Sequence, residues 1–293
     1  MEAIAKFIEH LKFEKRYSPH SLIAYEGDLK QWSLFLHSEF EVSTLNEVNA
    51  SFIRSWLVSL MESGLEARSV NRKITTLKSF YKYAVRCNWV EVNPMGKITS
   101  PKVSKRLPVY IEAEKLDLML DNQLFEDDFD GRRDHLILEL FYGTGMRLSE
   151  LIGLSIQNVD IRNLQLKVTG KRNKQRIIPL FPSLANQVSK FLDERNGIAS
   201  ENSILFIRKD GKALYPALVY RLVKKYLSTV STQKKRSPHV LRHSFATEML
   251  NKGADLNAIK EILGHANLSA TQVYTHNTIE KLKAAYKQAH PRA

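Results

Sequence analysis

Cysteine and long apolar runs are almost absent from this sequence. One cysteine, Cys87, occurs among 293 residues, which excludes an intramolecular disulfide and a zinc site built on several cysteines. No run approaches the ~18 consecutive apolar residues that a transmembrane helix needs, so we expect no membrane span. Residues 1–18 alternate charged with apolar side chains and lack the apolar core of a signal peptide, which favours a cytoplasmic protein.

Acidic residues are also few relative to basic ones. The chain contains 31 Asp and Glu against 44 Lys and Arg, so its formal net charge at pH 7 is +13. Such an excess favours a polyanionic partner, with DNA or RNA ahead of an anionic membrane surface. An ordinary basic enzyme remains open, because net charge reports non-specific attraction and not fold.

The length predicts two domains, since 293 residues exceed what one compact core usually serves. Residues 93–110 read NPMGKITSPKVSKRLPVY, with three prolines and a basic run, and they predict an extended linker. We therefore place a first domain at residues 1–105 and a second at residues 106–293.

Apolar residues spaced three and four apart predict that the first domain is helical. The expected helices cover residues 2–14, a segment that starts at Pro19 with Ser18 as its N-cap, residues 50–62 and residues 69–88. The last of them carries Lys78, Lys82 and Arg86 on a face separate from the apolar one. A solvated surface is the simplest explanation, but no acidic residue interrupts this basic stripe, which favours contact with a DNA backbone.

The second domain mixes helical and strand patterns, so the expected fold class is mainly α with a small β-sheet in the C-terminal domain. Short runs predict strands at residues 164–168 and 176–180, joined by the hairpin loop TGKRNKQ, and a third strand at 203–207. Helical periodicity covers residues 112–122, 132–142, 216–229, 238–252, 257–263 and 278–288.

Two motifs of the second domain place cations at turns. YGTGMRLSE has two glycines that end a helix and Arg147 before the next helix, where backbone donors already favour an anion. The hairpin loop holds Lys171, Arg172 and Lys174, and a lysine offers a transferable proton that an arginine effectively lacks. Either motif alone is common on exposed surfaces.

Two further motifs add histidines and a tyrosine. HVLRH places His239, Arg242 and His243 three and four residues apart, which predicts one shared helical face. LGHANLSATQVYTH follows with His265, just after a glycine that ends a helix, and Tyr274.

A metal site is the first alternative that these residues raise. His239 and His243 copy the spacing of a zinc-binding helix, but Val240 stands where a catalytic glutamate would follow the first histidine. Without carboxylates or cysteines nearby, zinc is disfavoured. The acidic run EDDFD, residues 126–130, suggests magnesium, yet it precedes a predicted helix, and helix-start electrostatics explain it better.

A phosphodiester substrate is the second alternative, and it fits more of the residues. Two arginines would grip the non-bridging oxygens and stabilise the charge that grows on them. A tyrosine would attack and become covalently linked. A histidine would accept the tyrosine proton, and the lysine or a second histidine would protonate the departing 5′ oxygen.

In this order the motifs resemble the tyrosine recombinase (phage integrase) family. TGMRLSE, TGKRNKQR, HVLRH, LGH and VYTH stand at workable spacings, and the similarity spans nearly the whole chain. The chain length, the helical first domain and GADLNAIKEILGHANLSATQVYTH look like the bacterial Xer branch. Glu248 stands where Xer proteins often have histidine, a departure outside the catalytic set.

The resemblance implies how the phosphate is held and attacked. Tyr274 would attack the scissile phosphate and form a 3′-phosphotyrosyl link, leaving a 5′ hydroxyl. Arg147 and Arg242 would hold the phosphate, and Lys171 would act as the general acid toward the 5′ oxygen.

The resemblance also implies supporting roles. His239 would assist as general base, and His265 would hydrogen-bond the phosphate. Glu150 would position its neighbours, while His243 would be structural. Because the phosphotyrosyl link conserves the bond energy, no ATP, metal or other cofactor would be required.

The same resemblance implies how DNA and other subunits are bound. A helical core-binding (SAM-like) domain, residues 1–105, and a catalytic domain, residues 106–293, would grip double-stranded DNA, with Arg172 and Lys174 adding to the contacts of the basic stripe. Four subunits, of one kind or shared with a second Xer recombinase, would assemble on two DNA sites. The last helix, residues 278–288, would dock on a neighbouring subunit.

The implied function is site-specific strand exchange, and the implied role is the resolution of chromosome dimers at a dif-like site during chromosome segregation. An integrase of a phage, integron or transposon would share the chemistry and is the nearest alternative. A DNA-binding protein without catalysis and a metal-dependent nuclease are alternatives of other classes.

Overall fold

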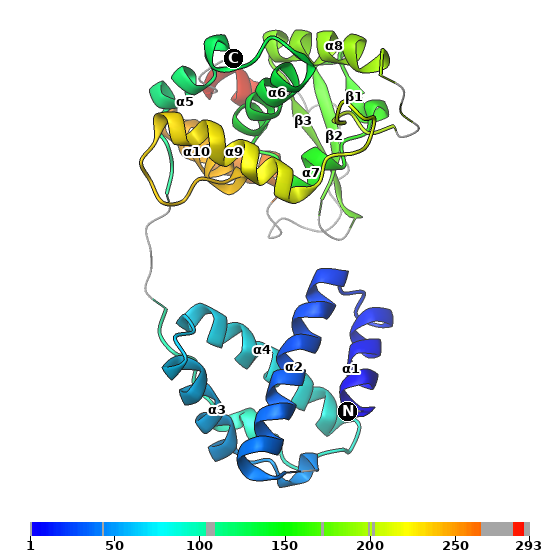
Figure 1. The fold of residues 1–293 in the computed structure, drawn as a ribbon, viewed down its shortest axis with the longest axis vertical. Coiled ribbons are helices and arrows are strands. Elements are labelled where there is room, and N and C mark those ends of the chain that lie inside the picture. The colour runs from blue at the N-terminus through cyan, green and yellow to red at the C-terminus, as the bar shows by residue number, and fades with distance from the viewer. Residues whose placement is uncertain are drawn as a thin grey trace. The chain divides into compact units, whose positions relative to one another are not determined.

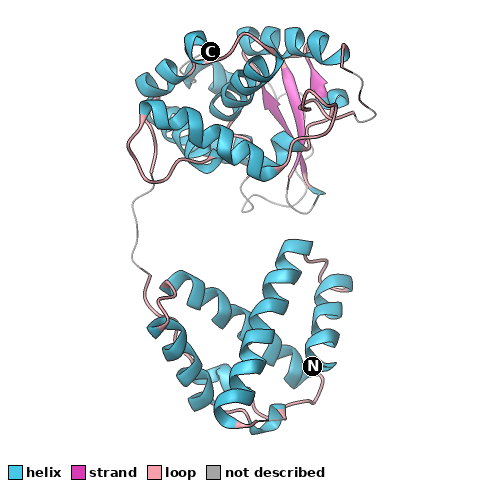
Figure 2. Ribbon diagram, viewed as in Figure 1, coloured by secondary structure: helices cyan, strands magenta, loops and turns pink. Residues whose placement is uncertain are grey.

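The structure of the chain is a computed structural model, and it describes residues 2–42, 44–103, 109–170, 173–198, 200, 203–264 and 284–289. The chain divides into two compact units, Met1–Arg106 and Leu107–Ala293, and each has its own hydrophobic core (Figure 1). The predicted fold class is confirmed, because helices dominate and a small sheet occurs in the second unit (Figure 2).

The described part of the first unit is built from helices. They are α1 (Glu2–Phe13), α2 (Pro19–Phe40), α3 (Ala50–Glu62) and α4 (Ala67–Arg86), with 3-10 turns at Leu45–Glu47 and Pro94–Lys97. As the sequence predicts, Ser18 is the N-cap of α2 and accepts a hydrogen bond from the backbone N–H of Ser21. Pro19 follows at the first helical position, where its missing N–H costs no helix hydrogen bond.

The core of the first unit buries aromatic side chains from three helices. Trp32 of α2, Trp56 of α3 and Tyr81 of α4 are each at most 2% exposed. The indole N–H of Trp32 donates to the hydroxyl of Tyr81 over 3.0 Å, so the polar ends of these two rings are paired inside the core. This packing fixes α4 against α2 and leaves the opposite face of α4 to solvent.

The sheet of the second unit has three antiparallel strands in the order β1 (Val159–Asp160), β2 (Gln165–Thr169) and β3 (Gln175–Pro179). Both predicted strands of the hairpin are present, shifted by one residue. The third strand predicted at residues 203–207 is wrong. Ile204 forms one isolated bridge with Ser155 and Ile207 one with Ala213, because this buried run changes partner instead of pairing with one segment along its length.

Helices surround this sheet in the second unit. They are α5 (Ala113–Met119), α6 (Phe129–Thr144), α7 (Leu148–Ile152), α8 (Pro182–Asn196), α9 (Pro216–Val230), α10 (Pro238–Asn251) and α11 (Leu256–Leu263), with 3-10 turns at Asn122–Leu124 and Ile156–Asn158. The sequence analysis missed α8 and the two-residue strand β1. In α6 every residue from 136 to 144 is buried, so this helix forms the centre of the unit.

The last predicted helix is described only in part. Residues 284–289 are helical, and residues 278–283 lie outside the described residues. Tyr286 is 2% exposed, its ring lies near those of Phe181 and Phe245, and its hydroxyl donates to the carbonyl oxygen of Gly143. This short segment therefore packs on the core of the second unit of its own chain.

Across the described residues, no helix has both the length and the apolar character needed to cross a membrane.

Candidate active site

Arg147 lies at a sharp turn between α6 and α7. Gly145 ends α6 with a left-handed backbone, φ 59°, and a Cβ at this position would lie 2.5 Å from a ring carbon of Phe245. Only glycine fits both the backbone and the space. Arg147 then becomes the N-cap of α7, and its side chain is 28% exposed, so it is fixed in place but reachable from solvent.

Glu150 is the acceptor around which this turn is organised. Its carboxylate accepts the backbone N–H of Arg147 over 2.7 Å and a guanidinium N–H of the same residue over 2.7 Å. Arg176 of β3 adds two further N–H donors, at 2.5 and 2.8 Å. Burial by itself raises the pKa of Glu150, but the hydrogen bonds and charges of the two arginines lower it to about 2. The carboxylate is therefore ionised at any working pH.

Arg242 of α10 is buried and points into the same cluster. One terminal nitrogen donates to the carbonyl oxygen of Gly145 over 2.6 Å and the other to that of Leu263 over 2.7 Å. Burial lowers the pKa of Arg242, as do the charges of Arg147 and Arg176, to about 10, while Glu150 opposes this change. Arg242 remains protonated at neutral pH.

The cluster carries an excess of positive charge. Three guanidinium groups, those of Arg147, Arg176 and Arg242, surround one carboxylate, that of Glu150. Two of the three are buried, so solvent screens their charges poorly. An anion bound at the exposed side of Arg147 would compensate this charge, and the planar donors of arginine suit the oxygens of a phosphate group.

The histidines of HVLRH do not share one environment with Arg242, although the spacing predicts a common face. His239 is exposed in the first turn of α10, Arg242 is buried, and His243 is half-buried. The side chain of Arg242 is drawn inward by the carbonyl groups that it contacts. His239 is consequently the more exposed histidine of this motif.

The hairpin loop that contains the predicted Lys171 starts beside the side chains of Arg147 and Glu150. Gly170 donates its N–H to the carbonyl oxygen of Lys174 over 2.7 Å and so closes the loop. A Cβ on Gly170 would lie 3.0 Å from a carboxylate oxygen of Glu150 and 3.4 Å from a guanidinium nitrogen of Arg147. Lys174 is exposed, and Lys171 and Arg172 lie outside the described residues. The base of this loop is therefore part of the cluster.

His265 and Tyr274 also lie outside the described residues. The chain leads directly into their segment from the cluster, because Gly264 is the residue before His265. Its carbonyl oxygen accepts a hydrogen bond from Arg147 over 2.8 Å.

The predicted basic stripe lies on the exposed face of α4. Lys78, Lys82 and Arg86 are all exposed. Arg86 stacks over the ring of Tyr83 and lies 3.9 Å from a carboxylate oxygen of Glu14 at the end of α1. The sequence spacing could not reveal this acidic neighbour, which comes from a different helix.

Exposed basic residues that the sequence analysis did not single out extend this pattern. Arg68 and Arg72, four residues apart, are also exposed in the N-terminal half of α4. In the second unit, α9 exposes Arg221, Lys224 and Lys225. The spacing of three and four residues between Arg221, Lys224 and Lys225 would have predicted that they share one face of α9.

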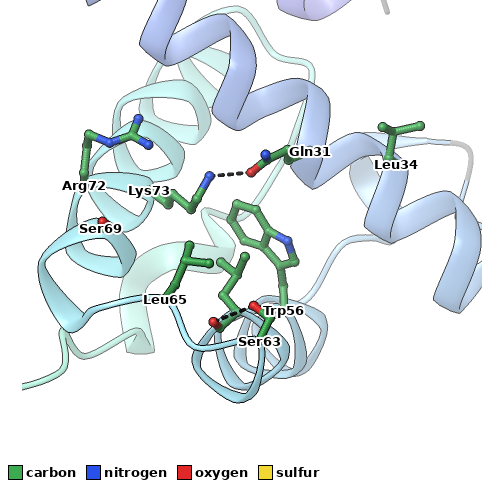
Figure 3. Close-up of a pocket in the computed structure, with 9 residues that line it drawn as sticks. Gln31, Leu34, Trp56, Ser63, Leu65, Ser69, Arg72 and Lys73 are labelled. Atoms are coloured by element: carbon green, nitrogen blue, oxygen red, sulfur yellow. Dashed lines mark hydrogen bonds between the residues drawn. The ribbon is translucent and has the colours of Figure 1, made fainter.

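A groove of about 570 Å³ lies between α2, α3 and α4 of the first unit (Figure 3). At its floor the ammonium of Lys73, over the ring of Trp56, donates to Asp28 over 2.8 Å and to Gln31 over 2.5 Å. Arg72 and Thr76 also donate to Asp28. The buried lysine therefore shares a buried carboxylate with Arg72, which is typical of a structural ion-pair network.

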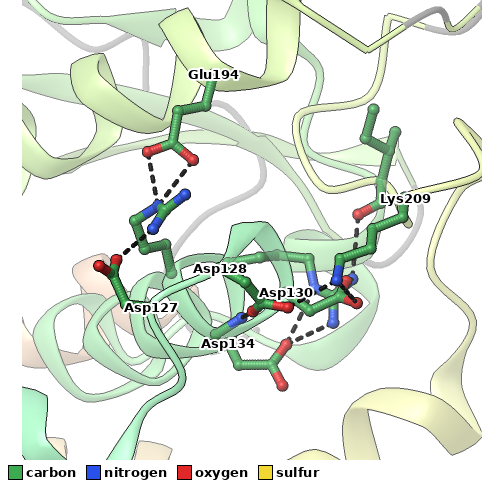
Figure 4. Close-up of polar contacts among 10 residues, drawn as sticks. Asp127, Asp128, Asp130, Asp134, Glu194 and Lys209 are labelled. Atoms are coloured by element: carbon green, nitrogen blue, oxygen red, sulfur yellow. Dashed lines mark hydrogen bonds and ion pairs between the residues drawn. The ribbon is translucent and has the colours of Figure 1, made fainter.

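The acidic run at residues 126–130 caps the start of α6 and forms ion pairs with basic side chains (Figure 4). Asp128 is the N-cap of α6 and accepts the backbone N–H of Gly131 over 2.8 Å. It also pairs with Lys209 over 2.6 Å, while Asp130 pairs with Arg133 over 2.5 Å. This arrangement confirms the interpretation of the run as a helix start. Within the described ranges, no three His, Cys, Asp or Glu side chains gather so as to hold a metal ion.

Comparison with known proteins agrees with this architecture. Residues 110–281 match the phage integrase family, and residues 4–88 match the phage integrase N-terminal SAM-like domain. The chain belongs to the phage integrase family of tyrosine recombinases.

The curated relatives belong to the Xer branch of this family. The chain is 35% identical to tyrosine recombinase XerC of Chlorobaculum tepidum, over 99% of this chain and 94% of the relative. It is 37% identical to XerC of Pelobacter propionicus, over 100% and 96%, and 34% identical to XerD of Staphylococcus haemolyticus, over 99% and 99%.

Solved structures share the fold. The XerH site-specific recombinase bound to palindromic difH substrate matches with a TM-score of 0.74 and 24% identity, covering 96% of this chain and 83% of that chain. The Tn1549 transposon integrase in complex with transposon right end DNA matches with a TM-score of 0.73 and 20% identity, covering 97% and 98%.

Proposed function

We propose that this chain cuts double-stranded DNA at a specific site and rejoins it to a second site through a covalent phosphotyrosyl link. The observation that carries the proposal is the guanidinium cluster, in which Arg147 and Arg242 come from distant segments of the chain to one turn. The cluster has positive charge in excess and arginine donors of the shape that a phosphate group requires.

The proposed roles follow from where the side chains lie. Arg147, fixed by Glu150 and partly exposed, binds a non-bridging phosphate oxygen directly. Arg242 adds positive charge from the buried side of the cluster, which stabilises the additional negative charge of the transition state. His239, exposed in the first turn of α10, accepts the proton of the incoming hydroxyl, and its exposure supports this role.

The remaining roles rest on the sequence motifs. Tyr274 attacks the scissile phosphate and becomes bonded to the 3′ phosphate, while the 5′ oxygen leaves as a hydroxyl. Lys171 supplies the proton that this oxygen needs, from the hairpin loop whose base contacts Arg147 and Glu150. His265 donates a hydrogen bond to the phosphate. Each strand transfer makes as many phosphodiester bonds as it breaks, so the reaction consumes no ATP. The arginines supply the positive charge that a metal ion would otherwise provide, so the proposed reaction uses no metal ion.

DNA outside the reacting phosphate is held by exposed cations in both units. In the first unit the contact surface is the basic face of α4, which includes Lys78 and Lys82. In the second unit Arg172 and Lys174 of the hairpin loop contribute. Such contacts neutralise phosphates and position the duplex without reading its sequence.

The biological role that we propose is resolution of chromosome dimers at a dif-like site, in the cytoplasm and together with a second Xer recombinase. The identity of 34–37% to XerC and XerD proteins over nearly the full length supports this role. The active assembly is a tetramer on two DNA sites. An integrase of a mobile element is the second candidate, because the fold matches the Tn1549 integrase about as well as XerH.

The test of the chemistry is a DNA duplex with a nick close to the cleavage point, which traps the covalent intermediate. The full chain is expected to form a DNA adduct that resists denaturant, whereas Tyr274→Phe binds the same DNA without forming it. A chelator should leave adduct formation unchanged. No adduct on a DNA site that the protein binds specifically would refute the enzyme, and loss of activity with chelator would favour a metal-dependent nuclease.

The test of the biological role is to recover genomic DNA from covalent adducts formed in cells. A single chromosomal site outside any mobile element is expected. Recovery at the ends of a mobile element would instead support the integrase.

A further inference from the structure

Arg176 is a charged residue on the buried face of a strand. Side chains alternate in β3, so Arg176 lies on the same face as Ile178, and both are buried. An arginine at an inward-facing strand position requires partners for its charge and its donors. The segment QRIIP does not alternate polar with apolar residues, so the sequence marks Arg176 only by its position two residues before Ile178 in a predicted strand.

The guanidinium of Arg176 joins three separate segments. It is carried by β3, next to the hairpin loop that contains Lys171. Its terminal nitrogens donate to both carboxylate oxygens of Glu150 over 2.5 and 2.8 Å, and Nε donates to the carbonyl oxygen of Ile262 over 2.6 Å. A two-point contact with the carboxylate and a third contact with α11 leave this side chain very little freedom.

The end of α11 is held by three arginines at once. Its last carbonyl groups have no partners within the helix. The consecutive carbonyl oxygens of Ile262, Leu263 and Gly264 accept N–H groups from Arg176, Arg242 and Arg147, respectively. These contacts also place positive charge at the negative end of the helix dipole. The residue that follows is His265, so the arginine cluster determines where its segment begins.

The contact between Arg176 and α11 is close enough to require glycine. Gly264 has a left-handed backbone, φ 65°, and a Cβ there would lie 3.1 Å from Cδ and 3.3 Å from Nε of Arg176. The glycine of LGH therefore satisfies two conditions, since it ends the helix and also makes room for the arginine.

We propose that Arg176 is a positioning residue for strand cleavage, which holds the lysine hairpin, the Arg147–Glu150 pair and the end of α11 in one fixed arrangement. The proposal rests on the proposed recombinase function. Arg176 is 5% exposed and its donors are directed to protein acceptors, so it acts on the reaction through its neighbours. Lysine cannot replace it, because an ammonium group lacks the planar fork that contacts two carboxylate oxygens and a third acceptor together.

The experiment compares the full-length chain with Arg176→Met, Arg176→Lys and a matched control. Arg195→Met is the control, because Arg195 is also a buried arginine of the second unit and donates to the carbonyl oxygen of Ile204, away from the cluster. The rate of covalent adduct formation on the nicked duplex is measured at saturating DNA, and DNA affinity is measured separately. Circular dichroism at the assay temperature establishes that each protein is folded.

Arg176→Met is expected to slow adduct formation by about 100-fold, the effect of misplacing reacting groups by about 1 Å. Its DNA affinity should stay within about threefold of the unchanged protein, since it removes no DNA contact. Arg176→Lys should recover only a small part of the rate. Arg195→Met, once folded, should cleave at the normal rate.

Three results would overturn the proposal while leaving the recombinase function intact. The first is an Arg176→Met protein that forms the adduct within about threefold of the normal rate at saturating DNA. The second is a loss that appears entirely as weakened DNA binding, which would place Arg176 in DNA binding. The third is an equal loss of rate in folded Arg195→Met, which would mean a general effect of removing a buried arginine. If Arg176→Met does not fold, the double variant Glu150→Gln with Arg176→Met removes the unpaired carboxylate. It should cleave more slowly than Glu150→Gln alone, because the contact of Arg176 with Ile262 at the end of α11 is lost as well. Equal rates in these two variants would refute the proposed arrangement.

Discussion

The guanidinium of Arg242 donates to the carbonyl oxygen of Gly145 over 2.6 Å, although the two residues are 97 positions apart in the chain. This contact joins α10 to the turn that ends α6, directly before Arg147. The donors of the proposed phosphate site are therefore held in place by backbone groups before any substrate binds. Such preorganisation spares the enzyme the cost of ordering the donors during the reaction.

Arg242→Lys should lower the rate of covalent adduct formation by about 10²–10³-fold, the usual effect of removing a donor that stabilises transition-state charge. The lysine keeps the charge but cannot reach the carbonyl groups of Gly145 and Leu263 together. Single-turnover cleavage of the nicked duplex measures the effect. Arg133→Lys is the control, since Arg133 is also buried and pairs with Asp130 and Asp134 instead. Equal losses in the two variants would argue against a specific role for Arg242.

Gly145→Ala should destabilise the fold by roughly 1–3 kcal/mol, because it combines a left-handed backbone with a Cβ placed 2.5 Å from Phe245. Gly27→Ala provides the opposite case. Gly27 lies within α2 with nothing close to its added Cβ, so alanine should stabilise by roughly 0.5–1 kcal/mol through helix propensity. Urea unfolding of the two variants measures both changes. If Gly145→Ala has the same free energy of unfolding as the unchanged protein, the turn accommodates the added Cβ without cost.

Glu150→Gln should destabilise the protein at pH 7 by roughly 3 kcal/mol, because it breaks buried ion pairs with Arg147 and Arg176. The pKa of Glu150 is lowered from 4.5 to about 2 in the fold, so ionisation stabilises the folded state above pH 4.5. This contribution disappears as the pH falls from 4.5 toward 2.

The stability difference between the unchanged protein and Glu150→Gln should therefore shrink across that pH range. Unfolding measured at a series of pH values tests this. A difference that does not vary between pH 5 and 2 would show that the carboxylate charge contributes nothing.

Asp128→Ala should cost about 1 kcal/mol, the value of an N-cap, because Asp128 caps α6. Asp127→Ala should change stability by less than about 0.5 kcal/mol, since its side chain is fully exposed and pairs only with a half-exposed arginine. Thermal unfolding distinguishes the two. The structural interpretation of the acidic run would be wrong if Asp128→Ala were neutral to stability but abolished adduct formation.

Lys78→Gln together with Lys82→Gln should weaken DNA binding for all sequences and make it less sensitive to salt. Each phosphate contact that is lost should lower the slope of log affinity against log salt concentration by about 0.9. Lys6→Gln, which removes a lysine that pairs with Glu2 on α1, is the control. An unchanged salt dependence of DNA binding in the double variant would show that the basic stripe does not contact DNA.

Local sequence patterns were sufficient for most of the helices, for the hairpin and for the fold class. Ser18 with Pro19 marks the start of α2 because capping and proline geometry act within one turn. The motifs also predicted the tyrosine recombinase family, since they contain the arginines, lysine, histidines and tyrosine that strand cleavage requires. Local patterns missed β1, which is too short to show an alternation, and misread residues 203–207, whose apolar run reflects burial and not pairing.

Tertiary structure alone decided how the arginines work together. Spacing predicts that Arg242 shares a face with His239, but carbonyl groups of Gly145 and Leu263 draw it into the core. Arg176 reads in sequence as one more cation of a basic loop, yet it holds Glu150 and Ile262 at once. The physical reason is that periodicity reports only which side of an element a residue lies on, whereas hydrogen-bond partners come from segments that meet only in the folded chain.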